Sequence, residues 1–336
     1  MSQPTSGDVH VNAPLTNISI AHIQSSGHFV SDRMFPNIPV TKQSDRYYVY
    51  SRADFNRDEM QERAPGTESA GSGYDLDNTP TYYAPVHAFH KDVPDQVRAN
   101  QDSVLNADRD ATIYVTQKAV IKRERTFAQR FMAPSVWANE KTGVNSGVNS
   151  GEFLLWNDAN SNPIEDVRSG KRAVLESTGF EPNKMCMSST VFDALVDHPD
   201  IVDRIKYGQT PGSPAIVNKA ALAALFGLEE ILVSKAVYNA AAKGATEDSR
   251  FIVGNHALLA YVTPTPGIMT PTAGYTFSWN GWFGASAMGH RVKRFRMEHL
   301  ESDRVEVQMA YDQKLVGSDL GFFFENAVDF DAVVSL

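Results

Sequence analysis

Apolar positions recur at four-residue steps along residues 95–132, the longest stretch of the chain without Pro or Gly. At 3.6 residues per turn, each four-residue step advances by about 40°, so such a row winds slowly around a helix. The pattern predicts one long helix over about 102–132. It could brace several partners or be an ordinary long core helix, and the pattern alone leaves both open. The row consists of Ala107, Ala111, Val115, Ala119, Phe127 and Phe131, with Arg123 as its single charged position.

Two polar segments precede this helix. Residues 1–45 carry four prolines and no lasting helical or strand period, which predicts an extended arm. Residues 46–92 place a polar, glycine-containing stretch between strand-like runs at 47–55 and 79–93, which predicts a long β-hairpin. A hairpin of this kind is marginal by itself. Because both segments offer little apolar surface, we expect arm and hairpin to be ordered only against neighbouring copies.

The remainder of the chain alternates between helix and strand patterns. Helix patterns occur at 163–177, 188–206 and 219–226, and strand-like runs occur at 185–187, 229–238 and 257–262. This alternation predicts a mixed α/β domain. Period-two runs at 290–300 and 305–309, followed by an apolar run at 322–328, predict closing strands with one solvated face.

Composition narrows the class of protein. The net charge of −9 argues against a dedicated nucleic-acid binder, whose surface is normally basic. The sequence shows no apolar run near 18 residues and no signal-peptide pattern, so we expect no membrane contact. The single cysteine, Cys186, lies in an apolar run and is expected to be buried as a small hydrophobic residue. A chain with one cysteine can form no internal disulfide, which is typical of a protein made in a reducing cytosol.

Charge is unevenly distributed between the hairpin and the long helix. Residues 54–77 carry seven acidic side chains against two arginines, whereas residues 118–130 carry five basic side chains against one glutamate. An acidic flap and a basic helix could pair within the chain or between copies, or could both be solvated faces without a partner. The candidate contact residues are Asp54, Asp58, Glu59, Glu62 and Glu68 in the hairpin, and Lys118, Lys122, Arg123, Arg125 and Arg130 in the helix.

Candidate catalytic patterns are weak. His87 and His90 would point to opposite faces of a strand, which disfavours a shared metal ion. The densest titratable cluster straddles a helix–Pro–helix turn, where capping by acidic residues is expected. Its members are Asp193, Asp197, His198, Asp200 and Asp203. We therefore predict no catalytic residue, no cofactor and no metal site.

Four runs carry a resemblance to a known family. They are TGFEPNKMCMSSTVFDALVDHPDIVDRIKYG, ALAALFGLEEILVSKAVYNAA and RFIVGNHALLAYV, which fall within 174–262, and AYDQKLVGSDLGFFFENAV near the C-terminus. With the order of elements, these runs make the chain resemble the major capsid proteins of tailed bacteriophages, whose Hong Kong 97-like capsid fold is shared with encapsulins.

The resemblance implies an α+β phage major capsid fold. Its parts would be an N-terminal arm (1–45), an extended β-hairpin loop (46–92), the spine helix with the peripheral domain (93–161), an α/β axial domain (162–290) and closing strands of the peripheral domain (291–336). Because the sequence starts directly at the arm, a separate scaffolding protein is expected rather than a fused scaffolding segment.

The leading functional hypothesis is a structural protein that self-assembles as hexamers and pentamers into an icosahedral shell around double-stranded DNA, bound non-specifically. The expected partners are further copies, a scaffolding protein, a portal and, in some shells, a decoration protein. The expected location is the virion capsid, assembled in the host cytoplasm. Two alternatives remain: an encapsulin-type compartment, and a soluble α/β hydrolase that uses the cluster at 193–203.

Overall fold

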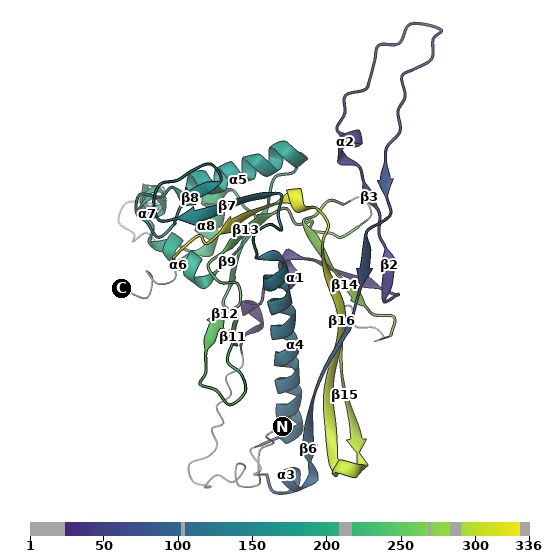
Figure 1. The fold of residues 1–336 in the computed structure, drawn as a ribbon, viewed down its shortest axis with the longest axis vertical. Helices are drawn as coiled ribbons and strands as arrows, with labels where there is room; N and C mark the ends of the chain where they lie inside the picture. Colours follow the sequence, from purple (N-terminus) through teal and green to yellow (C-terminus); the bar gives the residue numbers. More distant parts are fainter. Residues whose placement is uncertain (1–23, 102–104, 208–216, 268–269, 283–289, 330–336) are drawn as a thin grey trace.

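A computed structural model describes residues 24–101, 105–207, 217–267, 270–282 and 290–329 of the 336-residue chain. Helix α4 (Ala107–Phe131) stands upright at the centre of Figure 1. A mixed α/β body lies beside its upper end, long strands run along its lower half, and a loop projects from the top of the molecule (Figure 1). Among the described residues, no helix has both the length and the apolar character needed to cross a membrane.

The α/β body is built on a six-stranded sheet with the order β10-β9-β13-β17-β7-β8. Strand β13 runs antiparallel to both of its neighbours, and the other three pairs are parallel. This mixed sheet confirms the predicted α/β character of the region. The strands are β7 (Asn139–Val144), β8 (Glu152–Leu154), β9 (Lys184–Ser188), β10 (Glu230–Ser234), β13 (Ala257–Ala260) and β17 (Gly321–Glu325).

Both faces of this sheet are buried at its centre, which explains the unbroken apolar runs in the middle of β9, β10, β13 and β17. Met185 and Met187 of β9 pack with helices α5, α6, α7 and α8 on one face. Cys186, between them, points to the other face, where Phe127 and Phe131 of α4 lie. The four helices are α5 (Pro163–Thr178), α6 (Ser189–Asp197), α7 (Pro199–Tyr207) and α8 (Lys219–Phe226).

A second sheet supports the lower half of α4. Its longest strand, β16 (Ser302–Leu315), pairs with β14 (Gly274–Trp279) through its last residues, and β14 in turn pairs with β1 (Asn37–Val40). Earlier residues of β16 lie between β15 (His290–Met297) and β6 (Val86–Pro94). The antiparallel β15–β16 pair confirms the closing hairpin that the period-two pattern predicts.

The shorter elements connect these layers. They are the 3-10 turns η2 (Ser26–His28), η3 (Glu298–Leu300) and η4 (Ser318–Leu320), helices α1 (Ser31–Met34), α2 (Arg52–Phe55) and α3 (Asp95–Ala99), and strands β2 (Ser44–Arg46), β3 (Val49–Tyr50), β4 (Leu76–Asp77), β5 (Thr81–Tyr83), β11 (Val237–Asn239) and β12 (Ser249–Phe251).

The predicted long helix is present as α4. It begins at Ala107 because the Asn106 side chain accepts a hydrogen bond from the Arg109 N–H, which is an ordinary N-cap. The apolar row at four-residue steps is its buried face, as predicted. Near the lower end, Ala111 and Val115 pack against β6 and β16, whereas Phe127 packs against the α/β body. The winding row therefore lets one helix join two cores.

The predicted hairpin is present, but its two arms are paired over fewer residues than the sequence predicts. Its two arms pair only as β2 with β5 and β3 with β4. The strand expected over 47–55 is wrong at its end, because residues 52–55 form the helical turn α2. Residues 51–75 form the projecting loop in Figure 1, and we call this segment the acidic loop.

The expectation that the arm is ordered only against neighbours is wrong for its described part. Residues 24–40, named the strap here, lie on their own subunit, and Val30, Met34 and Phe35 are each no more than 1% exposed. Residues 1–23 lie outside the described residues. The division of the chain into arm, loop, peripheral and axial domains stays a prediction.

Candidate assembly surfaces

The acidic loop carries the five hairpin residues predicted to contact another subunit. Arg57 forms ion pairs with Asp54 and Glu59, and the Asp75 N–H donates to Asp54, which lowers the pKa of that carboxyl group. Asp58, Glu62 and Glu68 are exposed, without an ion-pair partner among the described residues. Most of the loop's acidity is therefore available for another molecule.

The predicted basic residues of α4 fall into two groups. Lys118, Lys122 and Arg125 are exposed, and no carboxylate in the described ranges pairs with them. Steps of four and three residues place them on one face of the helix. Arg125 lies over the ring of Tyr238, 4.5 Å from its centroid, so it also marks the edge where β11 meets the helix.

The other two basic candidates already have partners in their own chain. Arg123 is 8% exposed, its Nη2 lies 2.7 Å from an Asp32 carboxylate oxygen, and its guanidinium group covers Tyr311. Arg123 therefore holds the strap rather than offering a free contact, which sequence spacing could not show. Arg130 is exposed but lies 3.2 Å from a carboxylate oxygen of Asp312.

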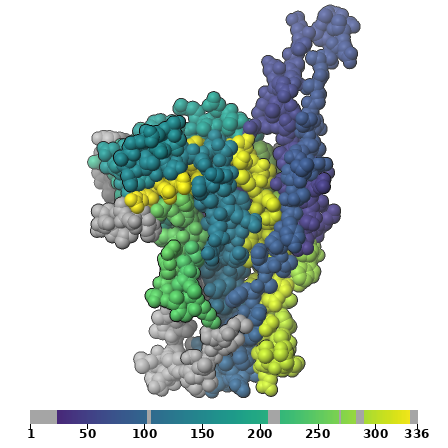
Figure 2. All heavy atoms as spheres, in the orientation of Figure 1, coloured from purple at the N-terminus to yellow at the C-terminus, as the bar shows by residue number. Residues whose placement is uncertain are grey.

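The acidic loop and the basic face of α4 do not pair within one chain. Where the structure describes them, the loop's ion pairs remain inside the loop or, through Arg52 and Asp319, reach the turn before β17. Figure 2 shows the loop standing clear of the body. Pairing between copies stays a prediction.

Glu124 is a central residue that sequence reasoning missed. Its side chain is fully buried, and its carboxylate oxygens accept hydrogen bonds from the Val30 and Ser31 N–H groups at 2.9–3.2 Å. These N–H groups begin α1, where a negative charge is favourable. Burial nevertheless raises the pKa of Glu124, and the two backbone hydrogen bonds oppose that shift.

Further contacts fasten the strap to the α/β body. The Gln24 side-chain amide exchanges two hydrogen bonds with the Val237 backbone, and Arg33 pairs with Glu230 of β10. Phe35 lies between two rings of α4, with centroids 5.2 Å from that of Phe127 and 4.6 Å from that of Phe131. The strap thus ties the sheet of the α/β body to the long helix.

The titratable cluster at 193–203 does not form a catalytic site. All four aspartates are exposed, and His198 is buried against Ser161. The Nδ1 atom of His198 accepts a hydrogen bond from the Asp200 N–H, so neutral His198 carries its proton on Nε2 and donates it to Ser161 Oγ at 3.1 Å. Ser161 Oγ donates in turn to the Asp158 carbonyl. His198 therefore cannot act as a base toward this serine in the observed arrangement.

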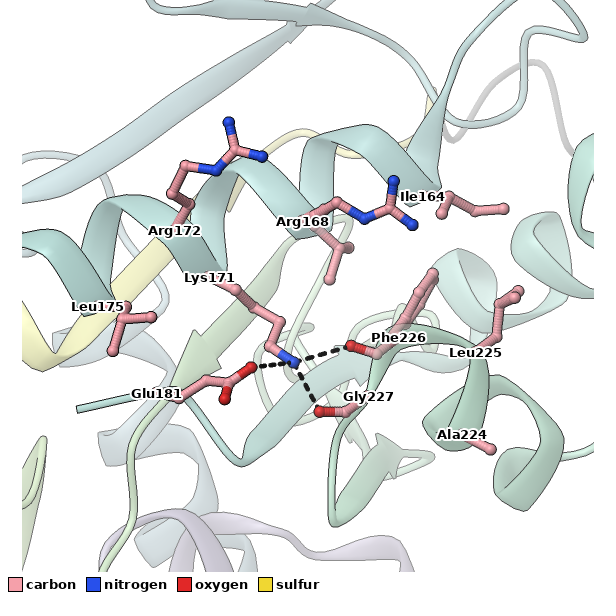
Figure 3. A pocket seen from close by; sticks show the side chains of 11 residues that line it. Ile164, Arg168, Lys171, Arg172, Leu175, Glu181, Ala224, Leu225, Phe226 and Gly227 are labelled. Carbon is pink, nitrogen blue, oxygen red and sulfur yellow. Dashed lines mark hydrogen bonds and ion pairs between the residues drawn. The ribbon is translucent and has the colours of Figure 1, made fainter. Parts of the chain in front are cut away.

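A groove lies between α5 and the end of α8 in the α/β body. It has a volume of about 390 Å³ (Figure 3). Lys171 crosses it, donating to the Phe226 and Gly227 carbonyls and pairing with Glu181 at 2.8 Å. This lysine neutralises the carbonyl end of α8, where a cation is favourable. Lys171 thus links α5 to the end of α8, and its ammonium group already has three partners.

No group of three candidate metal ligands occurs among the described residues. His87 and His90 lie on β6, and their odd spacing places them on opposite faces of the strand. Cys186 is fully buried, and burial raises the pKa of its thiol well above the usual range, which disfavours the reactive thiolate. The geometry therefore offers contact surfaces rather than a reaction centre.

Comparison with known proteins agrees with this picture. The family model described as "Phage major capsid protein E" matches residues 154–273. The major capsid protein of Pseudomonas phage JBD67 is 27% identical over 319 residues, covering 95% of this chain and 97% of that protein. The major capsid protein of Burkholderia phage BcepMu is 23% identical, covering 93% and 95% of the two chains. The chain is a homologue of phage major capsid proteins.

Solved structures support the capsid fold. A phage-related protein from Bordetella bronchiseptica matches with a TM-score of 0.66 at 23% identity, over 90% of this chain and 93% of that one. The capsid of cyanophage P-SCSP1u gives a TM-score of 0.59 at 11% identity, covering 94% and 92%. The SrpI encapsulin of Synechococcus elongatus gives 0.56 at 12% identity, covering 95% and 94%.

The encapsulin likeness concerns the fold alone, whereas the relatives by sequence are capsid proteins. The relatives by sequence therefore support the predicted structural role, and the encapsulin alternative is not the better supported one. The hydrolase alternative has no support in the cluster on which it depended.

Proposed function

We propose that this capsid protein assembles as hexamers and pentamers into a closed icosahedral shell that encloses double-stranded DNA. Assembly takes place in the host cytoplasm with a separate scaffolding protein and a portal, and a decoration protein can join the finished shell. The role requires no catalytic step. The net charge of −9 suits a wall that holds packed DNA without binding it tightly.

The observation that carries the proposal is the exposed acidic loop. Met60 is 94% exposed, and Phe55 and Tyr74 are 52% and 60% exposed. A projecting loop with this much apolar surface gains stability when a neighbour covers it. In a ring of identical subunits each loop can lie on the next copy, and the same contact then recurs around the ring.

We further propose that the acidic loop of one copy lies over the exposed basic face of α4 in the next. Its acidic residues are Asp54, Asp58, Glu59, Glu62 and Glu68. Their expected partners are now Lys118, Lys122 and Arg125, because Arg123 is buried and Arg130 already pairs with Asp312. Each exposed pair contributes only about 0–1 kcal/mol, so the effect depends on repetition around the shell.

The experiment is electron microscopy of negatively stained, purified protein. The parental protein should form closed particles that contain nuclease-protected DNA when isolated from infected cells. The triple variant Lys118→Gln, Lys122→Gln and Arg125→Gln should keep the parental circular-dichroism spectrum and give at least tenfold fewer particles. Glutamine retains side-chain length and helix propensity.

The matched control changes three exposed basic residues elsewhere, Arg172→Gln, Arg204→Gln and Lys206→Gln. It removes the same charge and should leave particle yield close to the parental value. Absence of particles from the parental protein would contradict the shell itself. A normal yield from the first triple variant would contradict only the loop–helix pairing.

A further inference from the structure

Both surfaces in the proposed contact carry an aromatic patch beside their charges. At the base of the acidic loop, Tyr50 of β3 forms a triangle with Phe55 and Tyr74, and the ring centroids are 5.4–6.0 Å apart. Phe55 and Tyr74 remain more than half exposed within this triangle. The rings contact one another but no larger core, so their outer faces are available to another molecule.

The matching patch lies on α4 and β6. The rings of Tyr114 and Phe89 are 5.9 Å apart, and the two side chains are 46% and 42% exposed. The Lys118 ammonium group lies 5.4 Å from the centroid of the Tyr114 ring. The aromatic patch therefore runs directly into the basic face, because Tyr114, Lys118 and Lys122 follow at four-residue steps along one side of the helix.

On both surfaces an aromatic patch is followed, in the direction of the chain, by charged side chains. On α4, Tyr114 and Arg125 are eleven residues apart, which is about 16 Å at ~1.5 Å per residue. On the loop, Phe55 and Glu62 are seven residues apart, which spans at most about 25 Å when extended. If Phe55 lies on Tyr114, the loop's acidic tip can reach Lys118, Lys122 and Arg125.

We propose that the aromatic triangle Tyr50–Phe55–Tyr74 of one copy docks on the Phe89–Tyr114 patch of the next, and that this apolar contact anchors the acidic loop. The inference rests on the proposed function, since it needs a second copy of this chain as the occupant. Aromatic side chains in a water-excluding contact contribute more to binding than rim charges do. The ion pairs then set the direction in which the loop lies.

Photo-crosslinking tests the docking directly. Phe55 is replaced by p-benzoylphenylalanine, which keeps an aromatic ring at the position, and assembled particles are irradiated. We expect covalent dimers on a denaturing gel, with the link mapped by mass spectrometry to residues 86–93 or 110–118. The matched control carries the same group at Phe180, a 38% exposed ring of the α/β body, and should not link to those peptides.

The outcomes separate the two proposals. Particles that give no covalent dimers, or links that map to another surface such as the α5–α8 groove, overturn the docking and leave the shell intact. Failure of the parental protein to form particles overturns the proposed function and the docking together.

Substitution gives an independent measurement. Phe55→Ser with Tyr74→Ser should fold as the parent does and lower particle yield at least tenfold. Tyr48→Ser is the control, because Tyr48 is 63% exposed in the same arm of the loop but lies outside the triangle. An equal loss of particles in Tyr48→Ser, or an unchanged yield in the double variant, would overturn the assignment of the anchor.

Discussion

The strap (residues 24–40) and the acidic loop (residues 51–75) are neighbours in sequence with opposite surroundings. Both are polar, irregular segments for which the sequence predicts contacts with other copies. The strap packs against α4 and the α/β body, with Phe35 fully buried. The acidic loop projects from the body, and Met60, its most exposed large apolar side chain, is 94% exposed.

The difference lies in what the rest of the chain supplies. The strap meets Glu124, which accepts hydrogen bonds from two of its N–H groups, and a pocket between Phe127 and Phe131 that receives Phe35. Buried backbone groups need such partners. In the described part of the chain, the ring contacts of the loop's aromatic residues are with one another and with Tyr50. Whether a polar segment packs on its own subunit therefore does not follow from its polarity. It depends on whether residues far away in the sequence supply hydrogen-bond acceptors and apolar contacts for it.

The largest expected effect comes from the anchor of the strap. Phe35→Ala should lower the free energy of unfolding of the unassembled subunit by about 3–5 kcal/mol, because it removes a fully buried ring and leaves a cavity. Phe55→Ala in the loop should change it by less than about 0.5 kcal/mol. Urea unfolding of the two variants measures the contrast. If the two variants lost equal free energy of unfolding, Phe35 of the strap and Phe55 of the loop would contribute equally to the stability of the single subunit, which contradicts their different burial.

Glu124→Ala should have the next largest effect. Two N–H groups at the start of α1 lose their acceptor, at about 1–3 kcal/mol for each buried group, which sums to about 2–6 kcal/mol. Because water entering the vacated space satisfies part of this demand, we expect a loss in the lower part of that range, about 2–4 kcal/mol. Unfolding by urea at neutral pH is the measurement, and a loss below about 1 kcal/mol would show that the strap does not depend on this carboxylate.

The pH dependence of this loss has a defined sign. Burial raises the pKa of Glu124 in the folded state above that of an unfolded glutamate. The protonated Glu124 carboxyl group therefore contributes its full share of the free energy of unfolding below the pKa of an unfolded glutamate. This contribution is lost as the pH rises through the raised pKa of Glu124 in the folded state. The cost of Glu124→Ala should therefore be greatest in acid and smaller at neutral pH. Asp166 also has a raised pKa, and subtracting the variant's profile from the parental profile cancels its contribution. Asp32 has a raised pKa too, but its charge interacts with Glu124, so the difference profile reports the two carboxyl groups together.

Several parts of the fold could be predicted because one local pattern determines each of them. The row at four-residue steps indicates α4 and its buried face, since helix geometry alone fixes that face. The Asn162–Pro163 start and the Gly179 end indicate α5, whose C-cap has the left-handed φ of 78° that favours glycine. Alternating positions indicate β15 and β16 for the same reason.

The strap and the buried roles of Arg123 and Glu124 could not be predicted because they depend on residues far apart in sequence. Glu124 and Val30 are separated by 94 positions, and no local pattern links them. The only sequence signal was that a charge at position 123 interrupts an otherwise apolar row. A charged residue on a buried row is compatible with a partner inside the chain, but the sequence does not identify Asp32 as that partner, and Arg123 was therefore predicted as a contact candidate.

The smallest and most discriminating effect concerns two adjacent residues of α4. Lys122 and Arg123 were both predicted to contact a neighbouring copy, but only Lys122 is exposed. Arg123→Gln should destabilise the unassembled subunit by about 1–2 kcal/mol, less than the ~3–5 kcal/mol of a fully buried pair. The reduction is expected because the Asp32 side chain is 38% exposed, so solvent screens the pair.

Lys122→Gln should leave unfolding within about 0.5 kcal/mol of the parent, as expected for an exposed residue. Its effect should appear only in assembly, as a modest loss of particles that grows when Lys118→Gln and Arg125→Gln are added. The two single variants share one helix, one change of charge and one replacement residue. If both alter unfolding, or both alter only assembly, then burial in the single chain does not separate the residues that hold the strap from those that face a neighbour.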